Sequence, residues 1–255
     1  MKRGVWIVLI ILLAVIVIGF VLFSQDSFNV SGASCDIKEI RETPVSLELA
    51  KTVALDNVNK NNPPFDWVYV GGYLSQNSLG DSIYYVLIFR KIDFTELTTL
   101  DVLEQNAQKF SDSESDDKSQ FNNIATVMTG SMKEDKLIQR HFRGLPEAIG
   151  KRLEIKQIVE ENYPGETIGD LIMNSPSDAG YYEIVSKETS QSSGNLISVY
   201  DNSIVSVGEL NNNLEMVEKR KRESYKEFSD SECELLMQSA EQGRLENIGQ
   251  WNSFE

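Results

Sequence analysis

A run of twenty residues without a charged side chain, residues 4–23, constrains this chain more than any other feature of its sequence. A helix rises about 1.5 Å per residue, so a run of this length spans a hydrocarbon core of roughly 30 Å. Lys2 and Arg3 precede the run, and the next charge is Asp26. Because cationic flanks stay on the cytoplasmic side, the sequence predicts a single-pass cell-membrane protein. Its N-terminus would be cytoplasmic, residues 4–23 would contact the lipid bilayer, and the C-terminal domain would be extracytoplasmic.

Two other interpretations of this N-terminus stay open. A cleaved signal peptide has an apolar region of about 7–15 residues with a small-residue site soon after it. Here the run is longer, and the small residues 31–34 lie well beyond its end. Lipidation of Cys35 would require the run to adjoin the cysteine and an aliphatic residue in place of Gly32. A retained signal anchor fits the pattern better than either alternative.

The rest of the chain is acidic, because the 255 residues together carry a formal net charge of -15. Such an excess opposes nucleic-acid binding, since the neutralisation of phosphates supplies most of that affinity. It also opposes docking on anionic lipid heads. Basic ligands, cations and cationic patches on other proteins stay compatible with it, although the plainer interpretation is that the carboxylates keep an exposed domain soluble. The sequence therefore predicts no nucleic-acid partner.

The chain has two cysteines, Cys35 and Cys233. On the predicted topology both lie in an oxidising compartment, where an even pair of exported cysteines is a candidate disulfide. The bond would close a long loop between the start of the ectodomain and its C-terminal region, contributing about 4–5 kcal/mol in the chain-entropy model. Two unconnected thiols are the alternative. Cys35 and Cys233 are the only site residues that the sequence suggests.

A helix is predicted after the polar stalk of residues 25–42. Thr43 can cap a helix, and Pro44 is tolerated at its first position. Apolar residues then follow at helical spacing until the Asn-Pro run at residues 61–64 ends the pattern.

Two strand-like runs come next, residues 67–75 and 82–91, joined by a turn-rich loop. The second run is apolar on both faces, which predicts a central strand covered on both sides. The pair Gly71-Gly72 within the first run predicts a bulge or a close backbone approach.

The middle of the chain is predicted to be helical around an acidic loop. Helical spacing covers residues 94–110, and a low-complexity acidic segment occupies residues 111–120. A further helix is expected at about residues 121–143, with a break at Gly130.

The second half repeats the first in outline. A helix-like segment, residues 146–163, precedes three strand-like runs, the last of which breaks at Asp201-Asn202, a pair that suits a two-residue hairpin turn. These runs are residues 167–173, 180–187 and 196–207. The order helix, strand, strand thus occurs twice, roughly a hundred residues apart.

Charged helices are predicted beyond residue 209. Ser229 with Glu232, or Ser231 with Glu234, can form a capping box at the start of the last one. The end of the chain, residues 243–255, is expected to fray.

Candidate chemistry in the sequence is sparse. His141 is the only histidine, so no zinc-binding histidine cluster exists, and we interpret it as a surface residue of a helix. Asp112, Glu114 and Asp116 have the spacing of a calcium loop, but Lys118 and Asn123 occupy positions where that loop needs ligands.

A basic run at residues 219–222 stands between glutamates and is interpreted as a solvated helix face. The sequence contains no glycine-rich phosphate loop and no nucleophile elbow. We predict no catalytic residue, no metal ligand and no cofactor.

Residues 154–210 resemble a PepSY domain, a small module of secreted-peptidase propeptides and of membrane-associated bacterial and archaeal proteins. The resemblance rests on IVEENYPG at 158–165, YYEIV at 181–185 and ISVYDNSIVSV at 197–207. The family usually has a glycine just before the final valine, where this chain has Ile204. Residues 47–91 resemble, more faintly, the same unit or the propeptide fold of secreted cysteine peptidases. The resemblance implies a helix packed on an antiparallel sheet and a role in binding, inhibiting or chaperoning a partner.

The predicted fold class is α+β, with an N-terminal transmembrane helix followed by an ectodomain of helix-on-antiparallel-sheet units and extra helices. The predicted segments are the membrane anchor (1–24), the stalk (25–42), the first α+β unit (43–110), the acidic loop and helical connector (111–145), the second, PepSY-like unit (146–210) and the C-terminal helices (211–255).

The leading functional prediction is a membrane-anchored, extracytoplasmic, non-catalytic binding or regulatory module. Its partner would be a protein outside the cytoplasm, such as a peptidase or another envelope protein. A self-associating structural envelope protein is one alternative, and an enzyme with an unrecognised site is another.

Overall fold

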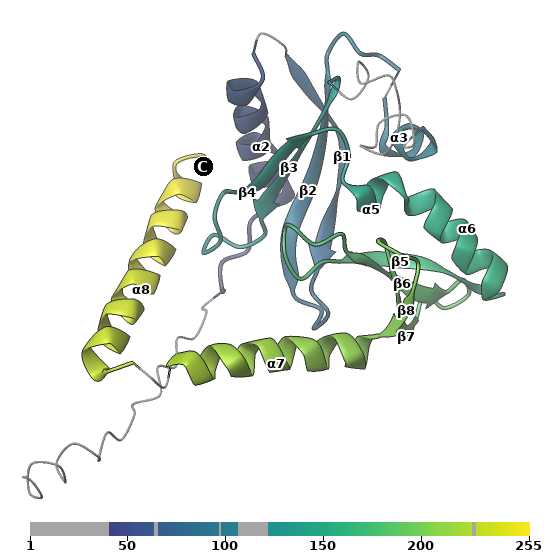
Figure 1. Ribbon diagram of the computed structural model, residues 1–255. Helices are drawn as coiled ribbons and strands as arrows, with labels where there is room; N and C mark the ends of the chain where they lie inside the picture. Colours follow the sequence, from purple (N-terminus) through teal and green to yellow (C-terminus); the bar gives the residue numbers. More distant parts are fainter. Residues whose placement is uncertain (1–40, 64–65, 97, 107–121, 226–227) are drawn as a thin grey trace, which may run out of the picture.

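The computed structural model describes residues 41–63, 66–96, 98–106, 122–225 and 228–255. In chain order their elements are α2 (Leu47–Asn61), β1 (Trp67–Gln76), β2 (Ser82–Lys91), α3 (Leu100–Gln105), β3 (Ile124–Gly130), β4 (Ile138–Arg143), α5 (Glu147–Gly150), α6 (Arg152–Asn162), β5 (Glu166–Ile172), β6 (Tyr181–Ser186), β7 (Ser192–Ser198), β8 (Ile204–Ser206), α7 (Val207–Tyr225) and α8 (Asp230–Asn252). The strands form one sheet in the order β4-β3-β2-β1-β5-β6-β7-β8 (Figure 1).

Two units of the same layout build this sheet. Each begins with a helix and continues as a four-stranded antiparallel meander, β1–β4 after α2 and β5–β8 after α5 and α6. Their first strands, β1 and β5, meet in parallel at the middle of the sheet, where the Met173 N–H donates to the Gln76 carbonyl at 2.7 Å. The predicted repetition of helix, strand and strand is confirmed.

Strand β2 is buried on both faces, as predicted. Along residues 86–89 the odd-numbered side chains face α2, and the even-numbered ones lie in a second apolar cluster with α3, α5 and α6. All of these side chains are at most 1% exposed. The bulge predicted at Gly71-Gly72 is also confirmed, because the register between β1 and β2 shifts between Tyr69 and Gly71.

The second apolar cluster joins the two units. Beneath α3, α5 and α6 it contains side chains of β2 and β3 from the first unit and of β5, β6 and β7 from the second. Tyr182 and Ile197 are fully buried within it. Removal of this shared apolar surface from water stabilises the contact between the units.

The second unit follows its sequence pattern closely. The predicted helix at 146–163 is present as α5 and α6, and the predicted strands are present as β5 to β8. The turn at Asp201-Asn202 is longer than a two-residue turn, because residues 199–203 join β7 to β8. Asn202 adopts a φ of 59° there, a left-handed conformation that asparagine tolerates better than most residues.

The predicted transmembrane helix and the single-pass membrane localisation need correction. Within the part of the chain that the structure describes, no helix is both long enough and apolar enough to cross a bilayer. The long helices α7 and α8 carry charged side chains along their length. The described fold is therefore α+β without a membrane-spanning helix. Residues 4–23, to which the span was assigned, lie outside the described residues.

The helix predicted at about residues 121–143 is wrong, because this stretch forms β3 and β4. All seven residues of β3 are buried. A strand covered on both faces gives a continuous apolar run, which its spacing alone does not distinguish from a helix. The expected break at Gly130 is where β3 ends, and a Cβ atom at this position would lie 2.4 Å from the Cβ of Asp135. Glycine therefore lets the following loop fold back onto the strand.

Two other helices begin or end differently from the prediction. α2 starts after Ser46, whose hydroxyl caps it, and not at Thr43, which bonds the loop between β3 and β4 instead. α3 covers only the middle of the predicted 94–110 helix. The acidic segment at 111–120 lies outside the described residues.

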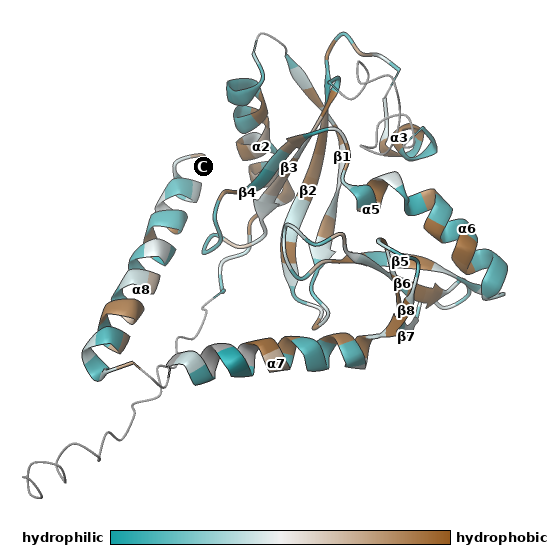
Figure 2. Ribbon diagram, in the orientation of Figure 1, coloured by the Kyte–Doolittle hydropathy of each residue, from teal (hydrophilic) through white to brown (hydrophobic). Residues whose placement is uncertain are grey.

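The C-terminal helices reach from the second unit back to the first. α7 follows β8, and α8 then runs beside the first unit (Figure 1). The capping box of Ser229 and Glu232 is confirmed. The expected fraying of residues 243–255 is wrong, because α8 continues to its last turn and Trp251 is fully buried in the cluster beneath α2. Asn247 and Trp251, in the last turns of α8, make the hydrogen bonds of this docking. Figure 2 shows α8 as hydrophilic along most of its length.

Candidate functional site

A cavity of about 540 Å³ lies where the two units meet. It is bounded by β4 of the first unit, by the start of α5 and by the loop between β5 and β6, residues 173–180. Ligand sites occur preferentially at junctions of this kind. This cavity, the junction pocket, is the candidate site.

Strand β4 presents the first side chains to the junction pocket. Successive residues of a strand point to opposite faces, so Arg140 and Phe142 share the pocket face while His141 faces α2. After β4 the chain turns at Gly144, whose φ is 82°. The buried Thr126 hydroxyl donates to the Gly144 carbonyl at 2.7 Å, which fixes the turn and brings α5 to the rim.

Arg140 is the cation of the junction pocket. Its guanidinium carbon lies 5.2 Å from the centroid of the Phe142 ring, and Nη1 donates to the Pro176 carbonyl at 2.9 Å. Arg140 has no ion pair with any carboxylate in the described part of the chain. Because a guanidinium carries five N–H donors, most of them remain available to a ligand.

Arg143 also borders the cavity, but its guanidinium is used elsewhere. The guanidinium carbon lies 5.4 Å from the Trp67 ring centroid, and Nη1 donates to the Asn122 carbonyl at 3.1 Å. Burial lowers the pKa of Arg143, yet a guanidinium stays protonated at neutral pH. Arg143 therefore adds positive potential near the pocket without facing a ligand there.

The two carboxylates of the lining are engaged within their own segments. Glu147 pairs with Lys151 at 2.6 Å. Asp178 accepts the N–H groups of Gly180 at 3.1 Å and of Asn174 at 3.5 Å. Asp178 thus closes the loop between β5 and β6 in the manner typical of turn aspartates, and neither carboxylate neutralises Arg140.

The floor of the junction pocket is apolar. Met128, Leu145, Ala148 and Met173 line it, and each is at most 4% exposed. Methionine side chains are flexible and polarisable, so they adapt to apolar groups of different shapes. An apolar floor with a guanidinium at the rim is suited to binding an apolar group that carries a negative charge beside it.

A second polar cluster lies deeper between the units. Arg152 of α6 bonds Glu104 of α3 at 3.2 Å, and its guanidinium carbon lies 5.5 Å and 5.0 Å from the ring centroids of Tyr73 and Tyr182. The Tyr73 hydroxyl donates to Glu104, and the Tyr182 hydroxyl donates to the Ala148 carbonyl at 3.0 Å. Because both units contribute, the cluster is a polar clamp across their junction.

The tyrosines of this clamp are held in the neutral form. Burial, followed by the hydrogen bond to Glu104, raises the pKa of Tyr73. Burial also raises the pKa of Tyr182 to about 12, although the charge of Arg152 opposes the shift. Both hydroxyls therefore stay protonated at neutral pH and act as hydrogen-bond donors. We assign the clamp a structural role, because its contacts join the two units.

His141 and Cys233 are not brought together as a nucleophile and base. His141 lies on β4 and is half-buried, so its interpretation as a surface residue of a helix is wrong. Its Nδ1 lies 2.7 Å from Asn57 Oδ1, and its Nε2 lies 3.1 Å from Asn62 Nδ2. Cys233 is 6% exposed on α8 and is disulfide-bonded. Cys35 lies outside the described residues, so its pairing with Cys233 stays a prediction.

The other motifs form no site in the described structure. The residues of the calcium-like spacing, Asp112 to Lys118, lie outside the described residues, and the basic run at 219–222 lies within α7. Over the described ranges, no group of three or more histidine, cysteine, aspartate or glutamate side chains could hold a metal ion.

Sequence reasoning missed the junction pocket because its walls are far apart in the chain. Arg140 and Phe142 alternate with His141, which is typical of a strand. Because residues 121–143 were predicted to be a helix, this alternation was not recognised. The other wall, residues 173–180, reads as an ordinary loop. No local signal connects the two walls.

No family model matches this sequence, and neither the curated proteins nor the solved structures contain a match to it.

Proposed function

We propose that this protein is a non-catalytic binding module that takes a segment of a partner protein into the junction pocket. An apolar side chain of that segment would rest on the floor, and a carboxylate next to it would pair with Arg140. The proposal is supported chiefly by one observation: a buried apolar floor lies beside a guanidinium without a carboxylate partner in the described chain.

The arrangement favours a protein ligand with a short recognised segment. A cavity of about 540 Å³ accommodates one or two side chains and falls in the usual range of ligand pockets, roughly 300–1,000 Å³. The negative charge of the whole chain repels acidic molecules at long range, so a single carboxylate beside an apolar group is a better match than a polyanion. The PepSY resemblance, which stays a prediction, agrees with a role in partner binding.

The test uses labelled peptides and one matched pair of variants. Peptides carrying Phe-Glu or Leu-Glu at their centre are titrated by fluorescence polarisation against the full chain, beside the same peptides with Gln in place of Glu. Loss of a charge-assisted hydrogen bond costs about 1.5–3 kcal/mol, so the Gln peptides and the Arg140→Gln variant should each bind about tenfold or more weakly.

Arg90→Gln is the control variant. Arg90 is also a strand arginine that donates to backbone carbonyls, those of Lys91 and Ile92, but it does not line the junction pocket. The Arg90→Gln substitution should therefore leave the affinity for the peptides unchanged. The proposal is wrong if no Glu peptide binds better than its Gln counterpart, or if Arg90→Gln weakens binding as much as Arg140→Gln.

A further inference from the structure

A groove that is separate from the junction pocket follows one face of α8 from Asp230 to Glu246. Its apolar side chains are Cys233, Met237 and Leu245, and polar and acidic side chains of the same helix border them. Met237 and Leu245 are more than half exposed, while Cys233 is only 6% exposed. α8 bonds the rest of the described chain through its last turns, by Asn247 and Trp251, so this docking does not reach Cys233.

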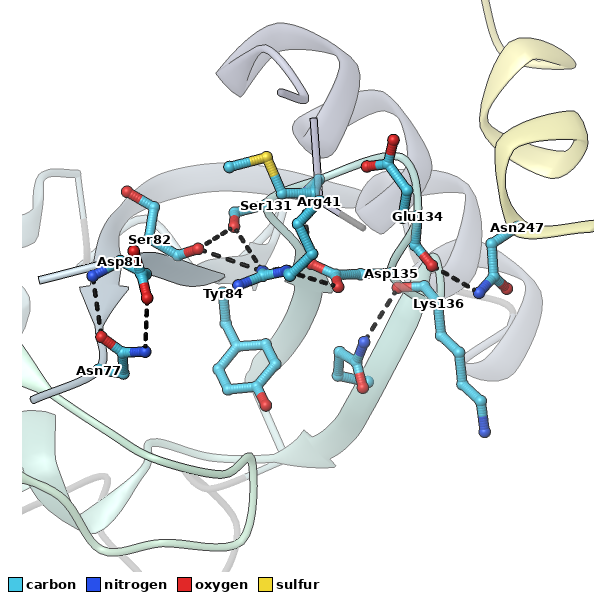
Figure 3. Close-up of polar contacts among 12 residues, drawn as sticks. Arg41, Asn77, Asp81, Ser82, Tyr84, Ser131, Glu134, Asp135, Lys136 and Asn247 are labelled. Carbon is cyan, nitrogen blue, oxygen red and sulfur yellow. Dashed lines mark hydrogen bonds and ion pairs between the residues drawn. The ribbon is translucent and has the colours of Figure 1, made fainter. Parts of the chain in front are cut away.

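The start of the described chain and the end of α8 meet on one loop, residues 131–137 between β3 and β4. Figure 3 shows Arg41 directed at Asp135, which it bonds at 2.7 Å, and Asn247 reaching the Glu134 carbonyl at 2.8 Å. The Glu134 carboxylate accepts the hydroxyl of Thr43 at 2.9 Å. Residues 41–43 and the last turns of α8 are therefore neighbours.

Electrostatics agree with this neighbourhood. The hydrogen bond from Arg244 to Glu241 raises the pKa of Arg244, and the charges of Glu134 and Glu42 raise it further.

We propose that the groove is occupied by this chain's own residues 35–40, tethered by a disulfide between Cys35 and Cys233. Cys233 is disulfide-bonded, and Cys35 is the only other cysteine of the sequence. The eight residues from Cys35 to Thr43 reach about 26–29 Å when extended. The fourteen from Cys233 to Asn247 rise about 21 Å along a helix, so the tether is long enough.

The spacing of apolar residues also matches. An extended chain advances about 3.3 Å per residue and its side chains alternate between two faces, so Ile37 would share the face of Cys35 and lie about 7 Å beyond it. Along α8, Met237 lies about 6 Å beyond Cys233. Ile37 would thus cover the exposed Met237, and the tethered segment would form a clasp along α8.

The first test locates the bond in the full chain. Thiols are blocked during purification, and peptides are mapped without reduction. We expect one linked peptide pair, containing Cys35 and Cys233, from a protein that migrates as a monomer without reductant. Free thiols, or a disulfide-linked dimer, would overturn the proposal.

The second test asks whether the segment covers the groove. Dithiothreitol breaks the S–S bond to two thiols and is itself oxidised to a cyclic disulfide. Hydrogen exchange of amides 234–246 should become at least about tenfold faster after reduction. Met237→Asp should speed the same exchange with the disulfide intact, whereas Leu235→Asp, an exposed residue of α8 outside the groove, should not. Equal effects of the two substitutions, or no effect of reduction, would contradict the clasp.

Discussion

His141 bridges α2 and β4 in one protonation state. The ring bonds an asparagine oxygen through Nδ1 and an asparagine amide through Nε2, so a neutral ring with its proton on Nδ1 satisfies both partners. A protonated ring would point an N–H at the Asn62 amide, which is also a donor. Burial, followed by the charge of Arg143, accordingly lowers the pKa of His141.

The neutral state of the His141 ring predicts that its contribution to the free energy of unfolding depends on pH. The unfolded chain binds a proton at His141 near pH 6.5, whereas the folded chain binds it only at lower pH, so the unfolded state takes up more protons between the two values. The contribution is fully present above about pH 6.5 and is lost as the pH falls toward the folded pKa.

The measurement is urea unfolding of the wild type and of His141→Gln at several pH values from 8 to 5. The difference in unfolding free energy between the two should shrink as the pH falls. A difference that is constant over this range would contradict the assignment of a neutral His141.

At the scale of elements, α8 shows that a polar helix can dock through its last turns around one buried side chain. Its surface is largely exposed, but Trp251 is fully buried beside α2, and its Nε1 donates to the Asp135 carbonyl at 3.0 Å. The sequence predicted the start of this helix correctly, because a capping box involves residues three apart. It did not predict the docked end, because the Trp251 pocket is built by α2 and by β2 and β3.

Truncation of this anchor should therefore cost far more than truncation elsewhere on α8. We expect Trp251→Ala to lower the unfolding free energy by about 3–5 kcal/mol, since it leaves a large cavity. Trp251→Phe, which keeps a ring but loses the hydrogen bond, should cost less.

Leu235→Ala serves as the control on the same helix. Leu235 is 66% exposed, so its truncation should change the unfolding free energy by no more than about 0.5 kcal/mol. Urea denaturation measures all three variants. A Trp251→Ala variant as stable as Leu235→Ala would show that α8 is not anchored there.

At the scale of the whole molecule, the shared apolar cluster and the polar clamp make the two units depend on each other. Arg152 and Glu104 come from different units and are largely buried. Removal of one partner leaves the other charge without its ion pair in a poorly solvated place. The two units should therefore unfold in a single transition, although each has the layout of a small α+β fold.

A double-mutant cycle tests this coupling. Arg152→Met alone should lower the unfolding free energy by about 2–4 kcal/mol, and Arg152→Met combined with Glu104→Gln should cost less than the sum of the two single changes. Trp67 of β1 and Trp251 of α8 lie in one apolar cluster, and the third tryptophan is Trp6. Tryptophan fluorescence of the Trp6→Phe variant, which reports on this cluster, should follow the same curve as far-ultraviolet circular dichroism. Separate curves, or strictly additive effects, would show that the units are independent.

The sequence by itself determined the features that depend on neighbours a few residues apart. These are the helix in each unit, the central strand β2, the bulge at Gly71, the strands of the second unit and the capping box at Ser229. The spacing of apolar side chains and the hydrogen bonds of helix caps involve residues close together in the chain, so the sequence predicts them directly.

Only the tertiary structure decided the rest. Burial on both faces made residues 124–130 a strand, although their apolar run is equally compatible with a helix. The docking of Trp251 fixed the C-terminal turns of α8, which the sequence predicted to fray. The junction pocket joins Arg140 to a loop more than thirty residues away. Contacts between distant segments form only when apolar surfaces of both units are buried together, and no local pattern encodes which surfaces those are.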